Sequence, residues 1–375
     1  MLRWTAAHVL TFLFFLLFVA FLVYCLYIKY RHIKYDHIPG PPRDSFLLGH
    51  SPSFLKVMRN GGIVQDKLLE WSETYGPVYR INIFHFVLIG VTCPDTTKVN
   101  IYLFYHMLHK HQCKGHQKNP IPFINEVREA CRLLRATGAQ WIHDRKTAIQ
   151  NGDDVPKDIL TQIIKTAGQD EELMVDNFVT FFIAGQETTA NQLAFCVMEL
   201  GRHPEIMEKV KKEVDDVIGM KMDIRYEDLG QLTYLSQVLK ETLRLYSTVP
   251  GTSRDILEDM VIDGIRIPGG FTCMLSSYVA GRMEKFFKDP LIFDPDRFHP
   301  DAPKPYYCYY PFALGPRSCL GQNFAQMEAK VVMAKLLQRF DFTLVPGQSF
   351  DILDTATLRP KGGVLCSIRH RKHSQ

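Results

Sequence analysis

The sequence predicts a mainly α-helical protein with a small β-sheet and one N-terminal transmembrane helix. Apolar residues recur at helical spacing through most of the chain from residue 122 onward. Two β-rich runs, 78–83 and 86–91, lie closer to the N-terminus and predict a strand pair joined near Phe84-His85. An uncharged run of about 20 residues, 9–28, is dominated by Phe, Leu and Val and has the length that a helix needs to cross a bilayer.

The composition excludes several classes of protein. With 375 residues, 46% of them hydrophobic, the chain is long enough for one large core or two domains. The net charge of +4 is modest, so we expect no nucleic-acid partner. The nine cysteines are odd in number and contain no C-x-x-C pair, which is typical of a reducing compartment and argues against a disulfide framework.

The first 43 residues predict an anchor followed by a hinge. The run 9–28 leads directly into Lys29, Arg31 and Lys34, whereas a cleavable signal has a shorter apolar core followed by small residues. By the positive-inside rule, residues 1–8 are lumenal and the chain after residue 28 is cytoplasmic. Residues 29–43 are basic and proline-rich and form a stiff hinge, which leaves residues 44–375 as the remaining domain.

Further elements follow from periodicity and turn signals. We expect helices at 125–150, 155–165, 176–199, 235–246 and 325–340, and a short strand region that begins near Pro250.

A loop near the C-terminus carries the most specific motif. Cys319 is suited to bind iron as a thiolate if backbone N–H groups restrain its lone pairs. Gly315 and Gly321 allow close backbone approach or positive φ, and Phe312 can shield the sulfur. Arg317 can pair with a carboxylate. The alternative is a buried free cysteine, but the four fixed positions around Cys319 favour an iron ligand.

A polar patch interrupts the apolar helix predicted at 176–199. Glu187 and Thr188 lie in this patch, where unpaired buried polar groups would cost roughly 1–3 kcal/mol each. Thr188 can donate to the carbonyl of Ala184, and Gly185 weakens the same turn, so we expect the helix to bend or open there. The alternative is a capping threonine in a bent core helix.

A third pattern pairs charges on one helix face. Glu241 and Arg244 are three residues apart, so they can hold each other and jointly receive another group. An isolated pair of this kind is usually an ordinary surface ion pair. Here the segment Pro295-Asp296-Arg297-Phe298 follows about 50 residues later, and the cysteine loop comes after it. This order of segments favours a structural role for the pair over an ordinary surface ion pair.

Together these motifs resemble the cytochrome P-450 monooxygenases. The string F-x-x-G-x-R-x-C-x-G resembles their haem-binding loop, and residues 184–189 resemble their oxygen-activation helix. The resemblance implies that Cys319 is the axial ligand of haem b and that Glu187 and Thr188 relay protons. It also implies that Arg254 contacts a haem propionate and that three residues form a structural lock beneath the haem: Glu241, Arg244 and Arg297.

The resemblance narrows to the cholesterol 24-hydroxylases. It covers about residues 35–98 and 123–370 and is carried by the segments 35–50, 176–185 and 331–339. It implies hydroxylation of the side chain of cholesterol or a related sterol in cholesterol catabolism, with dioxygen and with electrons from NADPH through a cytochrome P-450 reductase. A proline-rich hinge of this kind resembles that of P-450 enzymes of the endoplasmic reticulum membrane.

One region departs from the family pattern. About two dozen residues, Val99–Pro122, stand where the family has the helices that cover the haem and most of the roof over the substrate. The sequence therefore predicts a P-450 fold that is truncated internally and lacks part of its N-terminal helical half. The alternative function is a catalytically impaired isoform that holds haem weakly, acting as a non-enzymatic membrane protein or as a competitor for the reductase.

Two further patterns have simpler explanations. Trp141 and Arg145 have the W-x-x-x-R spacing of a propionate clamp, but an amphipathic helix with Trp141 inward and Arg145 outward explains them better. A cluster of metal-ligand types lacks the paired short spacings of zinc sites, so a solvated linker is favoured for His106, His109, His111, Cys113 and His116.

Overall fold

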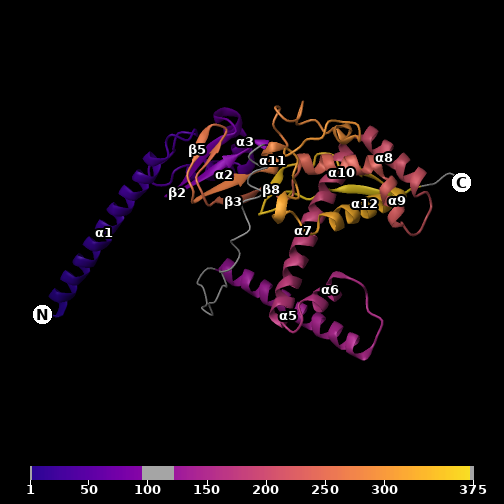
Figure 1. Ribbon diagram of the computed structural model, residues 1–375, viewed down its shortest axis with the longest axis horizontal. Coiled ribbons are helices and arrows are strands. Elements are labelled where there is room, and N and C mark those ends of the chain that lie inside the picture. Colours follow the sequence, from indigo (N-terminus) through magenta and orange to yellow (C-terminus); the bar gives the residue numbers. More distant parts are fainter. Residues whose placement is uncertain (1, 95–121, 372–375) are drawn as a thin grey trace. The chain divides into compact units, whose positions relative to one another are not determined.

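The computed structural model describes residues 2–94 and 122–371 and contains two compact units (Figure 1). The first unit comprises Met1–His106 and Asn191–Gln375, and the second comprises Met107–Ala190. Helices predominate, and the described sheets are small. The predicted class, mainly α with a small β-sheet and an apolar N-terminal helix, is confirmed.

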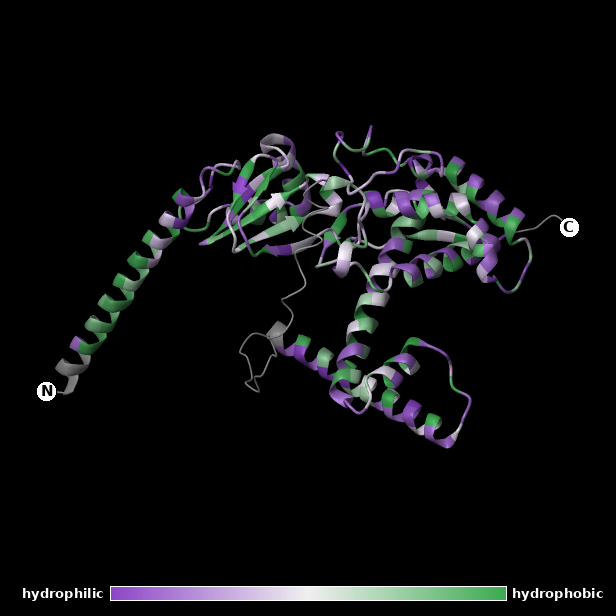
Figure 2. Ribbon diagram, viewed as in Figure 1, coloured by the Kyte–Doolittle hydropathy of each residue, from purple (hydrophilic) through white to green (hydrophobic). Residues whose placement is uncertain are grey.

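The N-terminal helix α1 (Leu2–Lys34) extends beyond the predicted run at both ends. Among the described residues it is the one helix that is long and apolar enough to cross a membrane, over His8–Lys34. In Figure 2 the ribbon of α1 has the colour of hydrophobic residues along most of its length. Its last turns differ, because Ile28 and His32 are buried, and His32 donates to the carbonyl oxygen of Phe84.

A four-stranded sheet follows α2 (Ser51–Arg59) and α3 (Val64–Tyr75). The hairpin of β1 (Val78–Ile83) and β2 (Phe86–Val91) has the bounds that the sequence predicts. Strand β6 (Phe271–Leu275) lies parallel to β2 and antiparallel to β3 (Thr252–Ile256), which produces the order β1-β2-β6-β3. Ile38, Ile89 and Cys273 are fully buried in its core, so the hinge packs onto the sheet.

The larger core of the first unit is helical. Its helices are α8 (Pro204–Val217), α9 (Tyr226–Gln231), α10 (Thr233–Leu245), α11 (Ser277–Ala280) and α12 (Gln322–Arg339). The apolar faces of α8, α10 and α12 meet around fully buried side chains that include Phe195, Val238 and Leu337. This packing fixes α12, whose first turn follows the cysteine loop.

Short strands pair at the edges of the first unit. The pairs are β4 (Met260–Ile262) with β5 (Ile265–Ile267), β7 (Phe340–Leu344) with β10 (Cys366–His370), and β8 (Ile352–Asp354) with β9 (Leu358–Pro360).

The second unit contains α5 (Pro122–Asn151), α6 (Ile159–Thr166) and most of α7 (Glu171–Arg202), whose C-terminal part belongs to the first unit. A Cβ added to Gly138 would lie 2.5 Å from the ring of Phe178, so a glycine is needed for this close packing. Helix α6 begins later than predicted because Asp158 caps it, accepting from the N–H of Thr161 at 2.9 Å.

The expected opening of α7 is wrong. The helix is α-helical throughout 184–189, and Phe182 and Ile183 in the run predicted to be buried are exposed. Thr188 does donate to the carbonyl oxygen of Ala184 at 2.8 Å, as predicted. A carbonyl has two lone pairs, so this bond can add to the helical ladder without breaking it.

Candidate functional site

Cys319 lies in a tight loop between the 3-10 turn η2 (Gly315–Arg317) and helix α12. Its backbone N–H donates to the carbonyl oxygen of Phe312 at 2.8 Å, which closes the loop. Gly315 has φ +74°, as its residue type allows, but Ala313 also has φ +54°. Sequence reasoning missed the second position, because alanine does not indicate a left-handed conformation.

The sulfur of Cys319 lies at the N-terminus of α12. Gly321 is the N-cap of this helix and has φ −83°, so the positive φ considered for it is not observed. A Cβ at 321 would lie 3.9 Å from the sulfur, at ordinary van der Waals distance, so the space around Gly321 does not require glycine. The N–H groups at a helix N-terminus favour negative charge, so this position suits a thiolate.

The segment around Cys319 exposes two large apolar side chains. Cys319 itself is exposed, Leu320 is 84% exposed and Phe324 is 55% exposed. Phe312 is partly buried in the same loop. Exposed aromatic and aliphatic side chains next to a thiol form a surface that a flat apolar group can cover.

Two guanidinium groups add positive charge near this loop. Arg254, on β3, donates to the hydroxyl of Thr252 and to the carbonyl of Ser253, both at 2.7 Å. Burial lowers the pKa of Arg254, and the nearby charge of Arg317 lowers it further. Two neighbouring cations are stabilised by an anion between them, and carboxylates are the anions that guanidinium groups bind best.

The residues present therefore fit haem b. A thiol at a helix N-terminus can ligate the iron, exposed apolar side chains can contact the macrocycle, and Arg254 and Arg317 match two propionates.

The structure brings Glu241, Arg244 and Arg297 together. Arg244 donates to both carboxylate oxygens of Glu241 at 2.7 Å. Arg297 lies in the 3-10 turn η1 (Pro295–Phe298), and its Nε is 3.4 Å from the same carboxylate. Arg244 also donates to the backbone carbonyls of Gly281, Pro290 and Ile292. The sequence could not indicate these carbonyl partners, because every residue has one.

Glu187 and Thr188 lie one after the other on α7, in the second unit. The hydroxyl of Thr188 is held by Ala184. A hydroxyl that donates to a carbonyl keeps two lone pairs, so it can still accept a hydrogen bond from water.

The expected orientation of Trp141 and Arg145 is wrong. Trp141 is 49% exposed, whereas Arg145 lies against α6 and donates to Asp158 at 2.7 Å and to Thr161 at 2.6 Å. Arg145 turns inward because the carboxylate of Asp158 pairs with its guanidinium. The histidine cluster 106–116 and the segment 99–121 lie outside the described residues.

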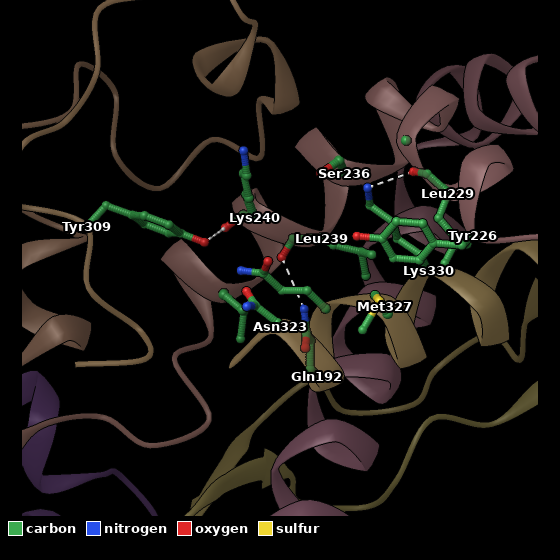
Figure 3. A pocket seen from close by; sticks show the side chains of 13 residues that line it. Gln192, Tyr226, Leu229, Ser236, Leu239, Lys240, Tyr309, Asn323, Met327 and Lys330 are labelled. Atoms are coloured by element: carbon green, nitrogen blue, oxygen red, sulfur yellow. Dashed lines mark hydrogen bonds between the residues drawn. The ribbon is translucent and has the colours of Figure 1, made fainter. Parts of the chain in front are cut away.

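A cavity of about 490 Å³ lies elsewhere in the first unit, among α9, α10 and α12 (Figure 3). Several of its polar side chains are bound to backbone carbonyls: Lys330 donates to Leu229 at 2.9 Å, and Tyr309 donates to Lys240 at 3.2 Å. Cys319, Arg254 and Arg317 are not among its lining residues. The cavity is therefore distinct from the cysteine loop.

Comparison with known proteins identifies the family. The cytochrome P450 family model matches residues 114–367. Cytochrome P450 4d2 of Drosophila melanogaster is 36% identical over 219 residues, which are 57% of this chain and 43% of the relative. Human cytochrome P450 3A7 is 39% identical over 176 residues, 46% of this chain and 35% of the relative.

A plant relative points to the same family. The 11-oxo-beta-amyrin 30-oxidase of Glycyrrhiza uralensis is 33% identical over 254 residues, 63% of this chain and 48% of the relative. The chain thus spans less than half the length of each of these three relatives. Members of this family use haem b, with electrons from NAD(P)H through a reductase. The cysteine loop, the Glu-Arg-Arg cluster and the family match lead to one conclusion: the chain belongs to the cytochrome P450 family.

Proposed function

We propose that the protein is a membrane-anchored haem-thiolate monooxygenase that hydroxylates a sterol side chain. The observation that carries the proposal is the geometry of the cysteine loop, in which the sulfur of Cys319 lies against the glycine N-cap of α12. When bound, the haem supplies the iron at which dioxygen is activated.

The residues of the chain have separate roles in this proposal. Cys319 ligates the iron, and Arg254 and Arg317 hold the propionates. Glu241, Arg244 and Arg297 hold the backbone of 281–292 in place, because Arg244 is bonded to three carbonyls of that segment. Glu187 and Thr188 pass protons through a bound water, since a hydroxyl and a carboxyl lie on one helical turn.

The sterol is proposed from sequence resemblance. The segments 35–50, 176–185 and 331–339 resemble the cholesterol 24-hydroxylases, which makes cholesterol the first substrate to test. The proposed electron donor is NADPH through cytochrome P-450 reductase. Helix α1 supports a single-pass membrane anchor, and we place the catalytic part on the cytoplasmic side of the endoplasmic reticulum.

A second candidate is an impaired isoform that holds haem weakly. The chain covers less than half of the three relatives described above, and α7 exposes Phe182 and Ile183 at mid-helix. Apolar side chains that stay exposed forgo about 25 cal/mol of stabilisation for each Å² that burial would remove from water. Such a protein would act as a competitor for the reductase, without turnover.

One experiment separates the two candidates. The full chain is purified in detergent, its haem content is measured, and the spectrum of the reduced carbonyl complex is recorded. Cholesterol hydroxylation per mole of haem is then measured with reductase and NADPH. A stoichiometric thiolate spectrum with turnover supports the enzyme. Substoichiometric haem and no product would reject it in favour of the isoform.

A further inference from the structure

The cavity among α9, α10 and α12 has the size of a small-molecule site (Figure 3). Its volume is about 490 Å³, and pockets that bury most of a small organic ligand have volumes of about 300–1,000 Å³. It is separate from the proposed haem site, because Cys319, Arg254 and Arg317 do not line it. The cavity therefore needs an explanation of its own.

Part of the cavity lining is apolar. Leu229, Leu239, Leu243 and Met327 line it together with Tyr226, which is 74% exposed, so the tyrosine ring is accessible from solvent. A thioether sulfur and a tyrosine ring both make favourable contacts with another aromatic ring. This part of the lining suits a flat aromatic group.

Polar side chains without partners line the same cavity. The side chains of Ser236, Lys240, Asn323 and Gln326 form no hydrogen bond or ion pair with another residue in the described part of the chain. Each of them can donate at least one hydrogen bond. A few polar groups of this kind fix the orientation of a ligand in an otherwise apolar pocket.

The charge at the cavity is positive. Lys240 and Lys330 line it, and its lining residues, all of them described, include no aspartate or glutamate. Burial lowers the pKa of Lys330, and the charge of Lys240 lowers it further. Glu213 acts in the opposite direction, but its carboxylate is bound to two backbone N–H groups at the start of α10. An anion would stabilise the charged forms of both lysines.

Lys330 also has donors to spare. Its Nζ donates to the carbonyl oxygen of Leu229 at 2.9 Å, and an ammonium group has three N–H donors. Two of these donors therefore remain for a ligand.

We propose that this cavity is a binding site for an aromatic carboxylate. The aromatic ring packs against Leu239 and Met327, and the carboxylate accepts from the ammonium groups of Lys240 and Lys330. The site needs no haem, so it goes beyond the proposed hydroxylation and does not depend on it.

The test uses 2-naphthoate and two analogues. Binding to the full chain in detergent is measured by equilibrium dialysis, with detergent alone as the blank. 2-Acetonaphthone has the same rings without the charge, and octanoate has the charge without the rings. We expect naphthoate to bind saturably and each analogue to bind about ten-fold more weakly or worse, because each lacks one half of the interactions.

A pair of glycine variants locates the ligand. Gly230 lines the cavity, and a Cβ added there would meet no atom within 4 Å, so a larger side chain has room to occupy the cavity. Gly230→Phe is therefore expected to abolish binding of naphthoate. Gly362→Phe is the matched control, because a Cβ at Gly362 also meets no atom within 4 Å and Gly362 does not line the cavity. Binding to this control should be unchanged.

A pair of lysine variants tests the charge. Lys330→Gln removes the positive charge but keeps a donor for the carbonyl of Leu229, and we expect it to bind naphthoate about ten-fold more weakly. Lys212→Gln removes an exposed lysine of α8 that does not line the cavity, and it should bind like the parent chain.

Each outcome decides the proposal. Absence of saturable naphthoate binding rejects it. Equal binding of naphthoate and acetonaphthone rejects recognition of the carboxylate, and equal binding of naphthoate and octanoate rejects the aromatic class. Binding to Gly230→Phe that equals binding to Gly362→Phe places the ligand elsewhere and rejects the site. Circular dichroism shows whether the variants fold. If Gly230→Phe does not, Lys330→Gln decides, and binding equal to that of Lys212→Gln rejects the site.

Discussion

Arg244 and Glu241 form a bidentate ion pair, and neither side chain has any exposed surface. Both bonds are 2.7 Å long, and Arg244 also donates to three carbonyls of the segment 281–292. Removing Arg244 would leave the buried carboxylate of Glu241 with only the longer contact to Arg297 and the N–H of Asp294. The pair therefore holds together helix α10 and the chain that leads to the cysteine loop.

Arg244→Met is expected to destabilise the protein by about 3–5 kcal/mol, because Glu241 remains buried and charged. Urea unfolding measures the change. Arg132→Met is the matched control: Arg132 pairs with Glu129 at the same spacing, but both side chains are exposed, so its loss should cost less than about 1 kcal/mol. Similar costs for the two variants would contradict the lock.

Cys319→Ala is expected to abolish the red-shifted Soret band of the reduced carbonyl complex, because it removes the proposed thiolate ligand of the haem iron. Absorption spectroscopy of the purified variant measures it. Cys131→Ala removes another exposed cysteine and should leave the band unchanged. A band that survives in Cys319→Ala would disprove the ligand assignment.

Thr188→Ala is expected to leave haem content unchanged and to raise peroxide release per NADPH consumed, because the proposed proton relay loses its hydroxyl while the proposed iron ligand, Cys319, stays. Thr180→Ala is a close control, since Thr180 donates to the carbonyl of Asp176 at 2.7 Å in the same way that Thr188 donates to Ala184. Equal coupling in the two variants would count against the relay.

The protein is expected to lose stability in mild acid through His50. Burial lowers the pKa of this imidazole from 6.5 to about 4, and its two nitrogens bond the carbonyl of Pro41 and the N–H of Asn82. Between these pH values the unfolded chain binds a proton that the folded chain does not. Stability is therefore greatest above pH 6.5 and falls by about 3 kcal/mol toward pH 4.

Urea unfolding from about pH 7 to about pH 4.5 measures this dependence. His50→Gln, which does not titrate, should flatten the slope over this range. An unchanged slope would show that another group is responsible.

Deletion of residues 1–28 is expected to reduce carbonate-resistant membrane association, because it removes the apolar span of α1. Western blotting of the extracted membranes measures it. An intact chain that is fully soluble would refute the anchor.

The sequence by itself determined the elements whose pattern is local. The hairpin β1–β2 has the predicted bounds, and the long apolar helix α1 was evident from composition. The cysteine loop was also evident, because its motif has glycine, arginine and cysteine at fixed spacing, and these residue types leave a signal in the sequence.

Only the tertiary structure decided which partners those residues meet. Arg244 donates to three backbone carbonyls, and every residue has such a carbonyl, so the sequence does not indicate which ones it binds. The bonds of Arg145 to Asp158 and of Tyr24 to His85 join separate segments of the chain, so a local pattern does not predict them. The left-handed Phe84 is the clearest case, since its residue type predicts the opposite conformation. Such contacts depend on which surfaces the packed chain brings together, and local preference carries no information about them.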